Sequence, residues 1–346
     1  MTADSLAHVE LYVHDDAEAL AHFTSALDFT PTAVSHRGPG GKARRSTLLT
    51  GGSVRLVVTA PTGPADEVAA HLARHGEGVV DIAFGCRDVP AAYGRAVAAG
   101  AAPLRPPTGD QPTARVGGFG SVSHTLVPPT APLPPGDWRT TGAARPATAR
   151  QLDHVAVCLT AGTLQSTATH YGCAFGLNRF SSEYTEVGDQ AMESLVVRDP
   201  AGSVTFTMIQ PDATRAPGQI DAFLAANGGP GVQHLAFLVD DVVDAVRRLG
   251  PRGVDFLSTP DAYYDRLVET GAAPAGRLAA IRSAGVLLDQ DEWGHLLQIF
   301  TRSPHRDGGL FYELIQRERA RGFGSANIRA LYEAVRRTEA AGASSR

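Results

Sequence analysis

The sequence predicts an α+β protein of two pseudo-symmetric halves, in which paired βαβββ modules form an open, curved sheet barrel with helices outside. Three observations carry this prediction. The segment from Leu6 (LAHVELYV) returns at Leu152 (LDHVAVCL), and the segment from Gly76 (GEGVVDIAFGCRDV) returns at Gly229 (GPGVQHLAFLVDDV). Residues 128–150 between the repeats are rich in Pro, Gly and Ala, which is typical of a linker. We therefore expect a structural half at residues 1–147 and a catalytic half at residues 148–346.

Each repeat predicts its own elements in order. The first repeat indicates a short strand and then a helix, and the second a strand that leads through an Asp-Val helix start into a helix ending at glycine. Alternating runs such as STLLTGGSVRLVVTA and SVTFTMIQP predict the remaining strands. Near the end, Ile328, Leu331, Tyr332 and Val335 recur at the spacing of one helix face. This predicts an amphipathic helix at about residues 325–340.

The composition excludes several classes of protein. Of the 346 residues 43% are hydrophobic and 19% charged, and no run approaches the roughly 18 apolar residues of a membrane span. The net charge is −5 and Lys42 is the only lysine, which argues against nucleic-acid binding. The three cysteines show no CxxC spacing and the N-terminus lacks a signal-peptide pattern. We expect a reduced, cytoplasmic protein that binds no membrane.

Three polar residues in strand-like runs predict a metal site in the second half. His154 (LDHVAV), His234 (VQHLAF) and Glu313 (FYELIQR) are separated by 80 and 79 residues, which suits three strands of one curved sheet facing the same hollow. Two imidazoles and one carboxylate with three open positions are the ligand set of a non-haem Fe(II) site that activates O2.

An alternative stays open at this point, because a single strand histidine is more often a hydrogen-bonded core residue than a ligand. The metal site is favoured by the repeated position of the two histidines and by Glu313, whose charge interrupts an apolar run. In the first half, His8 corresponds to His154 and Asp81 to His234, and we find no clear counterpart of Glu313. The first half is therefore expected to be a decayed copy of the site.

The second half resembles the catalytic half of the 4-hydroxyphenylpyruvate dioxygenase family, within the vicinal-oxygen-chelate superfamily. The matching strings cover most of residues 150–337: LDHVAV, GPGVQHLAF, STPDAYYDRL, HLLQIFT, FYELIQR and GFGSANIRALYEAV. The resemblance implies a 2-oxo acid-dependent dioxygenase in which His154, His234 and Glu313 hold Fe(II). It also implies O2 as co-substrate and 4-hydroxyphenylpyruvate as substrate.

Two departures from the family pattern bear on the product. Where the ring-hydroxylating members usually read P-I-N-E-P, this chain has Ile209 in place of the amide, and the C-terminal GFGSANI has Ile328 in place of the second aromatic. Both departures are similar to the members of the family that oxidise the benzylic carbon of the substrate and form 4-hydroxymandelate and CO2. 4-Hydroxymandelate would suit peptide-antibiotic biosynthesis. Ring hydroxylation to homogentisate remains the nearest alternative, since both swaps are also compatible with drift.

The resemblance implies ten substrate-binding residues, namely Ser194, Thr207, Ile209, Gln233, Gln298, Phe300, Phe311, Phe323, Asn327 and Ile328. The two glutamines would lie near the iron or substrate, and Ser194 and Asn327 near the phenol. The phenylalanines would line the pocket around the substrate's aromatic ring. Alternatively they would be ordinary hydrophobic-core residues, because a buried sheet face also needs aromatic side chains. The C-terminal helix would act as a lid, or simply pack.

Two other classes of protein share this architecture. Ligand-sequestering and resistance proteins would need no iron triad. A divalent-metal lyase or isomerase would take ligands from both halves, which Asp81 argues against. Function has to be argued from the site rather than from the fold. No partner protein is implied, although homodimers and homotetramers are common in the family.

Overall fold

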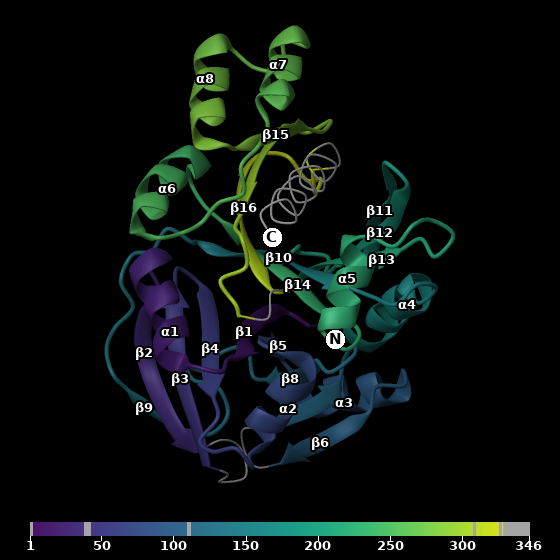
Figure 1. The fold of residues 1–346 in the computed structure, drawn as a ribbon. Helices are drawn as coiled ribbons and strands as arrows, with labels where there is room; N and C mark the ends of the chain where they lie inside the picture. Colours follow the sequence, from purple (N-terminus) through teal and green to yellow (C-terminus); the bar gives the residue numbers. More distant parts are fainter. Residues whose placement is uncertain (1–2, 38–42, 109–111, 307–308, 325–326, 328–346) are drawn as a thin grey trace.

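A computed structural model describes residues 3–37, 43–108, 112–306, 309–324 and 327 of the chain (Figure 1). The described part contains a nine-stranded sheet of order β6-β7-β8-β5-β1-β4-β3-β2-β9 and an eight-stranded sheet of order β11-β12-β13-β10-β14-β17-β16-β15. The first sheet lies wholly in the first half of the sequence and the second wholly in the second half. Two sheets built from sequence repeats confirm the predicted fold class.

The bounds of the first sheet and its helices are β1 (Ser5–Tyr12), β2 (Thr30–Arg37), β3 (Ala43–Gly51), β4 (Val54–Ala60), β5 (Gly78–Gly85), β6 (Pro103–Thr108), β7 (Thr113–Gly117), β8 (Ser123–Val127), β9 (Asp137–Thr140), α1 (Asp16–Ala21), α2 (Glu67–His75) and α3 (Val89–Ala98). A π-helical turn, η1 (His22–Ala26), continues α1.

The bounds of the second sheet and its helices are β10 (Gln151–Cys158), β11 (Asn178–Val187), β12 (Gln190–Arg198), β13 (Thr205–Pro211), β14 (Gly231–Leu238), β15 (Leu287–Gln290), β16 (His295–Phe300), β17 (Phe311–Glu318), α4 (Leu164–Phe175), α5 (Gln219–Ala226), α6 (Val242–Leu249), α7 (Asp261–Glu269) and α8 (Ala275–Ala284). A 3-10 turn, η3 (Gly250–Arg252), follows α6.

The predicted helix signals hold in both copies of the second repeat. The side chains of Asp88 and Asp241 accept backbone N–H bonds from the first turns of α3 and α6. Helix α3 is followed by Gly100, whose φ of 102° suits glycine, and α6 is capped by Gly250.

The two sheets also repeat each other in pairing. Strand β1 pairs parallel with β4 and antiparallel with β5, and β10 pairs in the same way with β13 and β14. The register shifts fall at equivalent places, leaving Ala7 and Val80 unpaired in the first sheet and Asp153 and Gln233 unpaired in the second. A bulge adds one residue to one strand and turns the neighbouring side chains.

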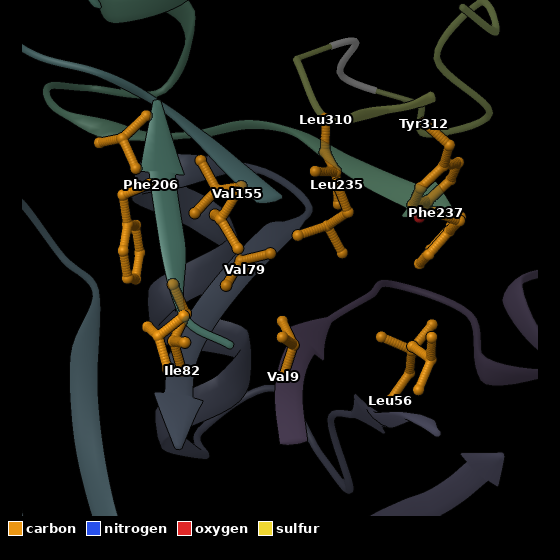
Figure 2. Packing of buried hydrophobic residues seen from close by; sticks show 14 of the residues in the cluster. Val9, Leu56, Val79, Ile82, Val155, Phe206, Leu235, Phe237, Leu310 and Tyr312 are labelled. Atoms are coloured by element: carbon orange, nitrogen blue, oxygen red, sulfur yellow. The ribbon is translucent and has the colours of Figure 1, made fainter. Parts of the chain in front are cut away.

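One apolar core is continuous across both halves (Figure 2). The Phe29 ring lies 5.6 Å from that of Phe237, and the Phe84 ring lies 6.1 Å from that of Phe206. Along β14, Leu235 and Phe237 belong to this core. Because side chains alternate along a strand, His234 and Ala236 face the other side of the sheet. The sheet thus separates a packed face from a face free for chemistry.

Two expectations need comment. The segment 128–150 is not wholly a linker, because β9 pairs with β2 and extends the first sheet, with Arg139 opposite Val34. Strand β9 has only four residues, so the alternation of its side chains is too short to predict a strand from the sequence. The predicted helix at 325–340 lies outside the described residues, and the boundary at 147/148 stays a prediction.

Across the described ranges, no helix is long and apolar enough to cross a membrane.

Candidate metal centre

Three buried side chains from neighbouring strands meet on the inner face of the second sheet. His154 on β10, His234 on β14 and Glu313 on β17 are 3%, 7% and 1% exposed. One ligand atom from each lies within 4.8 Å of the others, and in the described part of the chain this is the group that could hold a metal ion. The Glu313 Oε2 lies 3.4 Å from His154 Nε2 and 3.3 Å from His234 Nε2. The structure therefore brings the predicted trio together.

The strand register explains why these residues converge. His154 lies opposite Ala236, and Ala236 lies opposite Glu313 on the next strand. His234 lies opposite Ala156. Residues paired in this way share a face, so the two alanines leave a hollow between the three polar side chains. The bulged Gln233 places its Oε1 3.3 Å from His234 Nδ1.

An ion pair behind His154 fixes the orientation of its ring. His154 Nδ1 lies 2.9 Å from Asp153 Oδ1, which leaves Nε2 for the hollow. Arg317 donates from Nε to Asp153 Oδ2 at 2.7 Å and from Nη2 to Oδ1 at 2.8 Å. Such partners of a metal-binding histidine set its tautomer and raise its basicity. The sequence analysis missed both residues; the only local signal was an acidic residue before the histidine.

The charges in the hollow depend on one another. Burial favours the neutral imidazole, but the Glu313 charge and the Asp153 hydrogen bond outweigh it and raise the pKa of His154 to about 9. Burial would raise the pKa of Glu313, but the charge on His154 and hydrogen bonds from both histidines lower it to about 2. Burial lowers the pKa of His234. An anionic carboxylate therefore holds a proton on His154, and a divalent cation would replace that proton.

The donor set fits a non-haem iron. Two imidazole nitrogens and one carboxylate oxygen are the ligands typical of such Fe(II) sites. Gln298 donates from Nε2 to Glu313 Oε1 at 2.7 Å, so that Oε2 is the oxygen facing both imidazoles. The residues present therefore fit one metal ion with open positions.

The predicted aromatic residues lie against the trio. The Phe311 ring is stacked on His234 at 4.9 Å, and the Phe300 ring meets the same imidazole edge-on at 5.9 Å. The Phe323 ring stands edge-on to His154 at 5.2 Å. Phe300 also belongs to the main core, so here the two interpretations of the sequence apply together. These rings surround the histidines with apolar surface.

A chain of side-chain amides leads from Glu313 to Asn327. Asn327 donates from Nδ2 to Gln298 Oε1 at 2.8 Å and accepts from the Tyr263 hydroxyl at 3.0 Å. Both Gln298 and Asn327 were predicted to line the site, whereas Tyr263 on α7 was missed. Asn327 is thereby tied to the glutamine that bonds the Glu313 carboxylate. Ile328, the next predicted residue, lies outside the described residues.

The remaining predicted residues lie on the two strands beside β10. Thr207 is opposite Ala156 and Ile209 is opposite Cys158, while Ser194 on β12 is opposite Ile209. All three therefore share the inner face with His154. Thr207 Oγ1 is buried without a hydrogen-bond partner among the described residues, an unsatisfied group that a ligand could pair.

The first half lacks this set of groups. The register places His8 and Asp81 where the second half has His154 and His234. Strand β8 continues that register and places Thr125 at the position of Glu313, a counterpart that the sequence did not reveal. Thr125 donates instead to Asp81 Oδ2 at 3.0 Å.

Comparison with known proteins agrees with both repeats. Residues 151–299 and 7–116 match family models described as the glyoxalase/bleomycin resistance protein/dioxygenase superfamily. The chain is 30% identical to a probable 4-hydroxyphenylpyruvate dioxygenase of Aspergillus fumigatus over 96% of this chain and 93% of that protein. It is 29% identical to the 4-hydroxyphenylpyruvate dioxygenase of Yarrowia lipolytica, covering 96% and 91%.

A solved structure is more similar still. A triple mutant of 4-hydroxymandelate synthase from Streptomyces coelicolor is 53% identical, with a TM-score of 0.92 over 98% of this chain and all of that chain. Identity of this level over the whole length, with the three ligand-type residues assembled, establishes the family. The chain belongs to the 4-hydroxyphenylpyruvate dioxygenase family and is an enzyme of its class, the non-haem iron dioxygenases.

Proposed function

We propose that this enzyme uses Fe(II), held by His154, His234 and Glu313, to convert 4-hydroxyphenylpyruvate and O2 to 4-hydroxymandelate and CO2. The observation that carries the proposal is the 53% identity, over 98% of this chain, to a mutant of a protein described as 4-hydroxymandelate synthase. The assembled donor trio supports the iron. The two proteins described as 4-hydroxyphenylpyruvate dioxygenases are 29% and 30% identical to this chain.

Bound Fe(II) would supply the activation of O2 that drives decarboxylation and hydroxylation of the 2-oxo acid. The protein's own part is to position the substrate and to keep water out. The rings of Phe300, Phe311 and Phe323 form apolar walls beside the two histidines. The unsatisfied Thr207 hydroxyl, two strands from His234, is placed to hydrogen-bond an oxygen of the substrate. Excluding water protects a reactive oxidant from side reactions.

Aliphatic residues on the inner face support attack at the benzylic carbon. Ile209 is 7% exposed and packs in a small cluster with Cys158, Val187 and Met192. An aliphatic side chain cannot hydrogen-bond the phenol, so the ring is free to tilt until the side-chain CH2 lies nearest the oxidant. A shift of about 1 Å in placement is enough to change which carbon reacts.

The proposed metal is tested by O2 consumption after metal exchange. The protein is stripped with a chelator and reloaded anaerobically with Fe(II), Zn(II) or Mg(II), and 4-hydroxyphenylpyruvate is added with O2. We expect O2 uptake with matching CO2 release from the Fe(II) sample alone. Equal turnover with Mg(II) or Zn(II) would indicate lyase-type chemistry, and absence of Fe(II) binding would indicate a ligand-sequestering protein.

Replacing Ile209 by Asn together with Ile328 by Phe is expected to raise the homogentisate fraction. The amide can hold the phenol and the aromatic ring limits its tilt, so the product ratio should shift by about tenfold, equivalent to ~1.4 kcal/mol between competing barriers. Chromatography of both products measures the ratio. Met192→Leu, a change within the same apolar cluster, is the control and should leave it unchanged. An unaltered ratio in the double variant would remove this explanation of the product.

We further propose a cytoplasmic enzyme that forms a homodimer or homotetramer. Cys86 and Cys158 are buried free thiols, which suits a reducing compartment. Light scattering of the purified protein measures the assembly, and a monomer at working concentration would contradict this proposal.

A further inference from the structure

The first half contains a hollow at the position that corresponds to the metal centre. Its volume is about 360 Å³, and His8 and Glu10 of β1 and Thr125 of β8 line it. His8 and Thr125 occupy the positions of His154 and Glu313. A volume of this size is within the range of small-molecule sites. The first half therefore keeps the hollow, although it does not keep the residues that correspond to the metal ligands.

Three arginines from different strands project into this hollow. Arg44 of β3, Arg105 of β6 and Arg115 of β7 all line it. Arg44 is ion-paired with Glu10, and Arg115 donates from Nε to Asp81 Oδ2 at 3.1 Å.

Arg105 differs from the other two. Its hydrogen-bond partner is the Thr113 hydroxyl, 3.4 Å from Nη2, and no carboxylate of the described residues is within ion-pair distance of it. Its guanidinium therefore has donors left for a ligand and is held by no carboxylate of the described residues.

The hollow contains charges of both signs, because Glu10 and Glu67 line it beside the three arginines. Burial and, after it, repulsion from Arg115 lower the pKa of Arg44 to about 10, although the charges of Glu67 and Asp81 oppose this shift. Burial and the same Arg115 also lower the pKa of Arg105. The Nε atoms of Arg44 and Arg105 are buried without a hydrogen-bond partner among the described residues. Burial lowers the pKa of His8 to about 4, so its imidazole adds no charge at neutral pH. An entering anion would relieve this repulsion.

An apolar wall faces these charges. Trp138 of β9 lines the hollow together with Pro134, Pro135 and Leu104, and Leu104 is 55% exposed although it is a large apolar residue. A wall of an indole ring, two prolines and a leucine suits an aromatic ring, whereas the guanidinium groups suit a carboxylate.

We infer that the hollow of the first half binds a small aryl carboxylate, with its carboxylate on Arg105 and its ring against Trp138. This binding site is separate from the metal centre. The first half then carries a ligand site of its own rather than serving only as a scaffold.

Fluorescence of Trp138 tests this inference in the iron-loaded protein. The chain has two tryptophans, so Trp293→Phe leaves Trp138 as the only indole reporter. The probe is phenylacetate, which lacks the 2-oxo group needed to chelate a metal. We expect a saturable change in Trp138 emission, and about a tenfold or greater loss of affinity when Arg105→Gln is added, since a charge-assisted hydrogen bond is removed. Phenylacetamide, a neutral probe of the same shape, should bind at least about tenfold more weakly for the same reason.

Turnover of the metal centre serves as the folding control, because Arg105 does not contact the trio or its partners. Arg105→Gln should keep the turnover of the parent protein. The inference is overturned if phenylacetate causes no saturable change in a protein that turns over normally. It is equally overturned if phenylacetamide binds as well as phenylacetate, or if Arg105→Gln binds phenylacetate unchanged.

Discussion

Replacing Glu313 by Gln is expected to reduce turnover by about a thousandfold or more, because loss of the anionic ligand removes the charge that holds a divalent cation. The amide has nearly the same shape as the carboxylate, so the strand should keep its pairing. Glu313 is 1% exposed and faces both imidazoles with Oε2. With glutamine there, His154 also loses the main group that raises its pKa.

The loss is measured as turnover and, separately, as bound iron per chain. The matched control is Glu318→Gln on the same strand, where the carboxylate is partly exposed and pairs with Arg277 at 2.8 Å. The control should bind iron and turn over normally. A Glu313→Gln protein that folds, binds iron fully and retains turnover would show that Glu313 is not a ligand.

Replacing Arg317 by Met is expected to weaken iron binding by about 10- to 100-fold, the effect typical of losing a group that orients a metal-binding histidine. Arg317 holds Asp153 through two hydrogen bonds, and Asp153 in turn orients His154. Arg317 also donates from Nη1 to the Gly322 carbonyl at 2.6 Å, and its guanidinium lies 4.9 Å from the Phe323 ring centroid. One side chain thus supports a ligand and a wall of the site.

The same change should lower stability by about 3–5 kcal/mol, because it removes the arginine that pairs with the buried Asp153 carboxylate and leaves His154 as its remaining partner. Iron affinity is measured by competition with a chelator at a temperature where the variant is folded, and stability by denaturant unfolding. Arg282→Met is the control, since this exposed arginine also bonds two carboxylates, those of Asp261 and Asp265. Equal effects of the two variants on iron affinity would contradict a positioning role for Arg317.

The metal trio could be predicted because internal repetition marks equivalent positions. His154 and His234 each occupy one point of a repeated module, and the strands that carry them pair as the repeats require. The counterpart of Glu313 in the first half could not be found in this way. Thr125 is identified by strand register alone, since its surrounding sequence has no likeness to that of Glu313.

Residues that are far apart in the sequence but in contact in the fold could not be predicted from the sequence. Asp153 and Arg317 are 164 residues apart, and neither repeats in the first half, where Ala7 is the bulged residue in place of Asp153. The arginines of the first hollow come from three strands, β3, β6 and β7, whose sequences lie outside the two sequence repeats. Their convergence results from the curvature of the sheet, which a linear pattern of polar residues does not encode.

Identification of the product tests whether this iron enzyme oxidises the benzylic carbon of its substrate. The iron-loaded protein is mixed with 4-hydroxyphenylpyruvate and O2, and the product is compared by chromatography and mass spectrometry with authentic standards. We expect 4-hydroxymandelate and CO2 in equal amounts. Homogentisate as the main product would keep the metal centre but contradict the role given to the aliphatic inner face around Ile209.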